Sequence, residues 1–145
     1  MTLQLHRKQP LRRESHVRVV PVGGLEEVGR NMVYFEYIDK DPSSPMNGDI
    51  IIIDMGLQFP EENMPGIDYI VPNIASLIPK KKNIKGVIIT HAHYDHIGGI
   101  PHLMPRLGIH IPLFATDITL AIIKRRQEDF KNGNHQLNLK EITNE

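Results

Sequence analysis

The chain has 145 residues, with 17 basic and 17 acidic side chains, 40% apolar residues and no cysteine. This composition indicates a globular domain, or part of one, and excludes disorder throughout. It also excludes a disulfide scaffold, a thiolate zinc finger and a thiol nucleophile, and the formal net charge of zero provides no overall basic field for nucleic acid.

The N-terminal segment, residues 1–16, is basic, with Arg7, Lys8, Arg12 and Arg13, but no apolar stretch follows as in a secretory signal. We expect a solvated, disordered tail there, and an arm that touches RNA is the alternative. No apolar run approaches the roughly 18 residues that cross a bilayer. We therefore expect no membrane span and a cytoplasmic location.

Three strands are predicted in the first part of the chain by β-forming residues and turn signals. They cover residues 17–20, 32–38 and 49–54, and a turn-rich segment at 41–48 joins the last two. The third strand is apolar at positions 50–53, a pattern typical of a strand that is buried on both faces. That pattern favours an α/β sandwich over an exposed antiparallel sheet.

The second part of the chain alternates between predicted helices and strands. The predicted elements are a helix at 73–78 before three solvated lysines at 80–82, a strand at 86–90, a helix at 97–107, a strand at 111–115, an amphipathic helix at 116–131 that Asn132-Gly133 ends, and a strand at 137–142. The cap of the long helix is expected at Thr116 or Asp117.

A polar cluster directly after the strand at 86–90 contains His91, His93, Asp95 and His96. His91 and His93 leave an extended segment on the same side and can reach one metal ion, whereas Asp95 and His96, at the turn into a helix, can face a second. Zinc binds imidazole nitrogen and carboxylate oxygen, and paired ions can share a hydroxide for hydrolysis. The spacing therefore predicts a two-metal site rather than a histidine-rich surface loop.

The remaining histidines lie outside this cluster, and we predict that none of them is a metal ligand. They are His6 and His16 in or next to the tail, His102 and His110 on the expected surface, and His135 in an asparagine-rich turn.

The string THAHYDHIGG at 90–99 resembles the signature of the metallo-β-lactamase superfamily. The resemblance implies an αββα sandwich, of which this chain carries the first part. From the residues alone, Asp54 at the end of the apolar run is a turn cap. The resemblance implies instead that Asp54 supports the metal loop through hydrogen bonds, without being a ligand. We therefore predict that the strand ends bearing Asp54 and His91 lie side by side.

Flanking segments resemble the ribonuclease J family of the β-CASP branch over residues 17–142. They are GGLEEVGRNM at 23–32, FPEE at 59–62, GIDYIVP at 66–72, IKGVIIT at 84–90 and PLFAT at 112–116. These segments favour a nuclease over a thioesterase or lactonase with the same metal loop, which is the alternative.

The ribonuclease J resemblance implies a 5′-to-3′ exonuclease and endonuclease that acts on single-stranded RNA as a homo-oligomer. It implies two zinc ions, with manganese as the alternative metal: His91 and His93 hold one ion, and Asp95 and His96 hold the second. Asp95 also orients the nucleophile and so counts as catalytic. No residue is assigned to substrate binding.

The same resemblance implies that part of the enzyme is missing here. A further histidine, a bridging aspartate, the β-CASP domain and a C-terminal domain follow in that family. We therefore expect residues 17–145 to be the N-terminal portion of a metallo-β-lactamase domain that binds zinc weakly and is inactive alone. The other hypothesis is a non-catalytic fragment that needs a partner chain.

Overall fold

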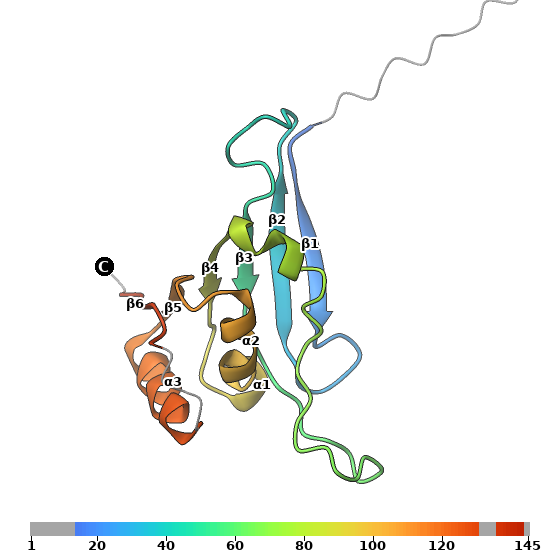
Figure 1. Ribbon diagram of the computed structural model, residues 1–145, viewed down its shortest axis with the longest axis vertical. Helices are drawn as coiled ribbons and strands as arrows, with labels where there is room; N and C mark the ends of the chain where they lie inside the picture. Colours follow the sequence, from blue (N-terminus) through green and yellow to red (C-terminus); the bar gives the residue numbers. More distant parts are fainter. Residues whose placement is uncertain (1–13, 131–135, 144–145) are drawn as a thin grey trace, which may run out of the picture.

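The computed structural model describes residues 14–130 and 136–143. Their centre is a six-stranded sheet whose strands follow the order of the chain (Figure 1). The strands are β1 His16–Gly23, β2 Met32–Ile38, β3 Ile50–Ile53, β4 Ile84–Ile88, β5 Leu113–Ala115 and β6 Leu139–Glu141. Neighbours from β1 to β3 are antiparallel and those from β3 to β6 are parallel. This is the α/β class that the sequence predicts.

The helices pack on one face of the sheet (Figure 1). They are the 3₁₀ helix η1 Ile78–Asn83 and the α-helices α1 Tyr94–Ile97, α2 Ile100–Leu107 and α3 Asp117–Asp129. On the covered face, register neighbours Tyr34, Ile52, Val87 and Leu113 are each no more than 3% exposed. None of the helices in the described ranges is long and apolar enough to cross a bilayer.

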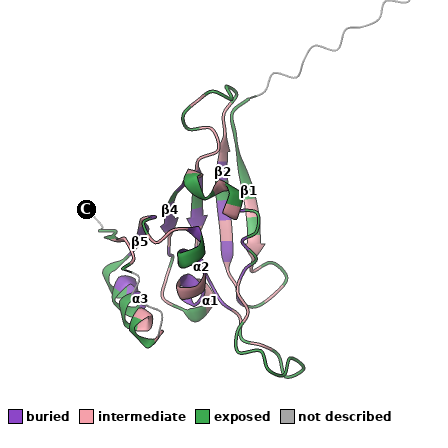
Figure 2. Cartoon of the chain, viewed as in Figure 1, coloured by how far each residue is buried: buried purple, intermediate pink, exposed green. Residues whose placement is uncertain are grey.

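The opposite face of the sheet carries apolar side chains that are open to solvent. Figure 2 shows that β1 consists of exposed and half-buried residues. Val19, Phe35 and Ile51 are register neighbours on this face and are 56%, 37% and 42% exposed. The prediction that the third strand is buried on both faces is therefore wrong for this chain. No described element covers this side, and β3 alternates between buried and exposed residues.

Two of the predicted helices differ in position from the observed ones. The segment at 73–78 forms turns, because the Asn73 side chain accepts a hydrogen bond from the Ala75 amide, and the helical turn comes later, in η1. The helix predicted at 97–107 is divided at Gly98-Gly99 into α1 and α2. Lys80 is not simply solvated, because its Nζ lies 2.7 Å from the buried Glu36 carboxylate.

The remaining predicted elements are present, with shifted ends. The basic residues of the predicted tail, the helix stop at Asn132-Gly133 and His135 lie outside the described residues.

For the site, the most important feature is the parallel pair β3 and β4. The amide of Asp54 donates to the Ile88 carbonyl at 2.9 Å, which aligns the carboxyl ends of the two strands.

Candidate metal centre

Asp54 lies beside the histidine-rich loop at the carboxyl ends of β3 and β4. Its side chain is buried, and Oδ1 accepts a hydrogen bond of 2.8 Å from the Thr90 amide. Oδ2 lies 2.8 Å from the Thr90 hydroxyl and 2.7 Å from His96 Nδ1. The predicted proximity of Asp54 to the loop is confirmed, and its supporting role toward a metal remains a prediction.

These hydrogen bonds favour one tautomer of His96 and His91. A carboxylate only accepts, so His96 Nδ1 is the donor to Asp54. The Thr90 hydroxyl donates to Asp54 and is then free to accept from His91 Nδ1, at 3.0 Å. In the neutral form of each ring, this arrangement leaves Nε2 as the nitrogen that can bind a metal ion.

The backbone after β3 is closely packed against the loop. Asp54 has a left-handed φ of 61°, an unusual conformation outside glycine and one that is often found at functional sites. The Met55 amide then donates to the His96 carbonyl at 2.8 Å. A Cβ on Gly56 would lie 1.7 Å from the Asp95 carbonyl oxygen, so only glycine fits at this position.

Asn31, immediately before β2, contacts the loop from a third part of the chain. Its amide nitrogen donates to the Asp95 carbonyl at 3.0 Å, and its side-chain Nδ2 donates to Asp95 Oδ2 at 2.9 Å. The same Nδ2 is 3.2 Å from His96 Nε2. Asn31 was expected only as part of the segment that resembles ribonuclease J, and its contact with the loop was not predicted. An asparagine that follows a glycine-containing turn is a weak signal by itself.

The four predicted donors form two pairs. His91 Nε2 lies 3.1 Å from His93 Nδ1, and His96 Nε2 lies 3.3 Å from Asp95 Oδ2. Two ligands of one tetrahedral zinc ion are separated by about 3.3 Å, given metal–ligand bonds of about 2.0–2.1 Å. In the described ranges, no three His, Asp or Glu side chains converge on a single metal-sized centre. Imidazole nitrogen and carboxylate oxygen are donor types that zinc accepts, so the chemistry of this cluster is compatible with that metal.

The histidines outside the loop that the structure describes, His16, His102 and His110, are not part of this cluster. His102 differs from the surface residue that the sequence predicts, because its ring stacks on Tyr69 at 4.2 Å and meets Phe130 edge-on at 5.1 Å. Its Nε2 is buried and has no hydrogen-bond partner among residues 14–130 and 136–143, and burial lowers the pKa of His102 below its usual 6.5. His110 is exposed in a loop, and His16 Nδ1 lies 3.0 Å from the Glu14 carbonyl oxygen.

Comparison with known proteins assigns the chain to a class. A family model described as "Beta-lactamase superfamily domain" matches residues 49–145, and the chain belongs to this superfamily. The observed sheet and helices are thus a partial domain of that fold, as the sequence predicts.

Among the curated relatives the similarity is to ribonuclease J, which confirms the predicted resemblance. The Thermus thermophilus ribonuclease J is 36% identical over 133 residues, which cover 90% of this chain and 22% of that protein. The Helicobacter pylori ribonuclease J (strain 26695) is 40% identical over 121 residues, covering 83% of this chain and 16% of the relative. The chain thus spans about a fifth of the length of these relatives.

Among solved structures, a diphosphatase of the PhnP family superposes with a TM-score of 0.46 at 20% identity. The superposition covers 79% of this chain and 38% of that one.

Proposed function

We propose that this chain supplies part of the active site of a metal-dependent ribonuclease that hydrolyses phosphodiester bonds. The observation that carries the proposal is the cluster of His91, His93, Asp95 and His96 directly after β4. Asp54 and Asn31 hold one end of this cluster through side-chain hydrogen bonds. Similarity to ribonucleases J supports RNA as the substrate. The finer proposal is 5′-to-3′ exonuclease and endonuclease activity on single-stranded RNA, by a homo-oligomer in the cytoplasm.

In this proposal two zinc ions, or manganese in their place, supply a hydroxide nucleophile and stabilise the charge that develops on the phosphate. His91 and His93 hold one ion, and Asp95 and His96 hold the other. Asp54 accepts a hydrogen bond from Nδ1 of His96, which leaves Nε2 as the nitrogen that would bind the ion. Asn31 holds the Asp95 carboxylate in place through its side-chain amide and can orient its oxygens.

We further propose that residues 17–145 are the N-terminal portion of the metallo-β-lactamase domain, after a basic tail at 1–16. The remaining ligands then come from residues outside this chain. Zinc sites usually have three or four protein ligands, and each proposed ion has two here. The 145-residue chain therefore binds zinc weakly and has no appreciable nuclease activity alone.

A chimera tests the ribonuclease proposal. The part of the Thermus thermophilus ribonuclease J that matches this chain is replaced by residues 17–142, and hydrolysis of a 5′-monophosphorylated single-stranded RNA is measured with zinc or manganese. We expect metal-dependent cleavage that is lost in His93→Ala and in Asp95→Ala but kept in His110→Ala. A folded chimera that binds metal but does not cleave RNA contradicts the proposal.

Experiments on the isolated chain test the proposal that it carries only part of the ligand set of the metal site. Calorimetric titration with zinc is expected to show weak binding that His93→Ala and Asp95→Ala reduce further, and the RNA assay is expected to show no turnover. Tight binding of two zinc ions, or metal-dependent cleavage by the isolated chain, contradicts that statement. His135 then becomes the next candidate ligand.

A further inference from the structure

Two aromatic side chains lie next to the candidate metal centre and are not among its proposed ligands. Tyr94, the first residue of α1, directly precedes Asp95 and is 37% exposed. Phe59, in the loop after β3, is 64% exposed, and its ring centroid lies 5.9 Å from that of Tyr94. Exposing two large aromatic rings to water is unfavourable, and their position beside the loop suggests a ligand.

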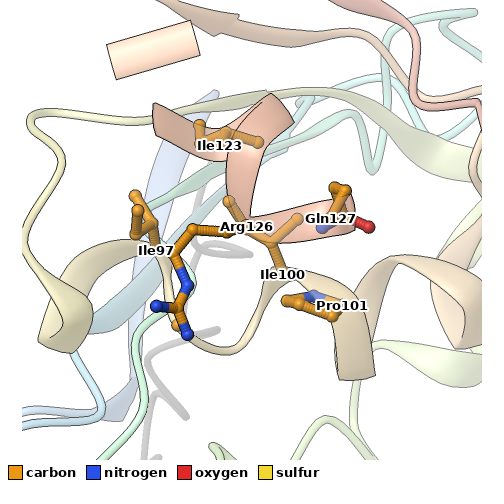
Figure 3. A pocket seen from close by; sticks show the side chains of 7 residues that line it. Ile97, Ile100, Pro101, Ile123, Arg126 and Gln127 are labelled. Atoms are coloured by element: carbon orange, nitrogen blue, oxygen red, sulfur yellow. The ribbon is translucent and has the colours of Figure 1, made fainter. Parts of the chain in front are cut away.

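A cation also lies over the Tyr94 ring. Arg126 of α3 lies over the ring, with Cζ at 3.7 Å from the centroid. Figure 3 shows the Arg126 side chain extending from α3 past Ile97 of α1. Within the described part of the chain, no carboxylate pairs with Arg126, whereas the adjacent Arg125 pairs with Glu128 at 2.9 Å. A guanidinium stacked on a ring keeps its N–H edges free for an anion such as phosphate.

The two rings border a surface hollow of about 670 Å³ that extends to Asp95. Its other walls include Glu26, Glu27 and Val28. Glu27 already pairs with Arg30 and accepts a hydrogen bond from the Gly24 amide, which lowers the pKa of Glu27. A wall of carboxylates repels phosphate groups, so an uncharged, flat group is a better occupant of this hollow than a phosphate.

We propose that Phe59 and Tyr94 form a stacking platform for an unpaired nucleobase of the substrate strand, with Arg126 contacting the adjacent phosphate. The proposal rests on the ribonuclease function proposed above and assigns to Phe59 and Tyr94 the contact that selects the single-stranded substrate. Every base has a flat face, so stacking tolerates any sequence. A duplex keeps its bases stacked on one another and cannot use the platform.

Binding without cleavage tests the platform. The full 145-residue chain in EDTA is titrated into a single-stranded decaribonucleotide that contains 2-aminopurine, whose fluorescence falls when it stacks. We expect quenching by the wild-type chain and roughly fivefold to tenfold weaker binding by Phe59→Leu, in line with the contribution of one base–aromatic stack. Phe59→Trp is expected to restore both binding and quenching.

Matched control variants distinguish stacking on the platform from general effects of removing an exposed aromatic ring or a positive charge. Tyr69→Leu changes another exposed tyrosine that stacks on His102, and Arg125→Gln removes the cation next to Arg126; both are expected to bind as the wild type does. Arg126→Gln is expected to weaken binding and to reduce its dependence on salt.

Three results would overturn the platform: no quenching by the wild-type chain, equal binding of Phe59→Leu and wild type, or equal binding of duplex and single-stranded RNA. The assay contains no free metal ion, so its result does not depend on metal binding or on cleavage by the chimera. An inactive chimera together with Phe59-dependent quenching removes the ribonuclease proposal and keeps the base-stacking site.

Discussion

The two ends of the loop at 91–96 receive different support from the rest of the chain. Asp95 and His96 are held by Asn31 and Asp54, which come from the segments before β2 and after β3. His91 reaches Asp54 only through the Thr90 hydroxyl, and the only side-chain hydrogen bond of His93 within the described residues is to His91. Asp95 and His96 are thus positioned by side chains from distant parts of the chain. His91 and His93 are positioned mainly by their own neighbours in the loop.

His96 and His93 also differ in exposure. The His96 side chain is 20% exposed, whereas His93 is an exposed residue. A donor that is already fixed in the folded chain loses little freedom when a metal binds, and a mobile donor loses more. We infer that the Asp95 and His96 pair is the preorganised half of the candidate centre. His93 needs the metal, or residues outside this chain, to fix its ring.

The largest loss of stability is expected where Asp95 contacts the backbone that follows β3. Gly56→Ala places a Cβ within 1.7 Å of the Asp95 carbonyl oxygen, so the loop and the segment after β3 must separate. We expect a loss of about 3 kcal/mol or more in the free energy of unfolding, measured by urea denaturation. Gly66→Ala is the control: its Cβ meets nothing within 4 Å, and only its φ of 82° opposes the change.

A smaller loss is expected when the carboxylate that supports His96 is removed. Asp54→Ala leaves the Thr90 amide and His96 Nδ1 without their acceptor, for a cost of about 2 kcal/mol in stability. Asp49→Ala, which removes only an exposed pairing with Lys85, is expected to cost well under about 1 kcal/mol. Equal losses for the two variants would mean that Asp54 does not brace the loop.

The two histidines at opposite ends of the loop provide a direct comparison. Without metal, His93→Ala is expected to change stability by less than about 0.5 kcal/mol, and His96→Ala to lower it by about 1 kcal/mol, because only His96 is bonded to a buried carboxylate. In EDTA, denaturation curves of both variants measure this difference. If His93→Ala is the more destabilising variant, the division between the two ends is wrong.

The smallest effect concerns His102, a histidine that the fold holds by packing rather than by hydrogen bonds. Burial lowers its pKa in the folded chain below 6.5, so on acidification the unfolded chain takes up a proton first. Stability is therefore lost as the pH falls through about 6.5. His102→Phe keeps a ring between Tyr69 and Phe130 and removes this loss, so between about pH 7.5 and 5 its stability should fall less than that of the wild type.

The sequence was most informative where a motif coincided with a strand end. The resemblance of the loop to the metallo-β-lactamase signature predicted that Asp54 lies beside it, and the parallel pair of β3 and β4 brings Asp54 to His96. Asn31 was not predicted, because its contact with Asp95 depends on a turn with positive φ at Glu26 and Arg30 that local composition does not specify.

Burial of a strand on both faces also could not be predicted from the sequence. The apolar run at 50–53 indicates what a strand can tolerate on each face, but whether both faces are covered depends on elements packed against it. In the described chain only the helical face is covered, and Ile51 is 42% exposed. The same limit applies to His102, whose neighbours Tyr69 and Phe130 come from distant segments.

The long separation between the loop and its supports also has a consequence for folding order. Asn31 and Asp95 are 64 positions apart, and Asp54 and His96 are 42 apart. Contacts between distant residues form only after the intervening chain has been closed into loops, which slows folding. His91, His93 and His96 therefore lie on an unsupported segment until β4 has joined β3, and a metal ion added before that step meets flexible imidazoles. Zinc supplied during refolding should for this reason be captured in non-native arrangements more readily than zinc supplied afterwards.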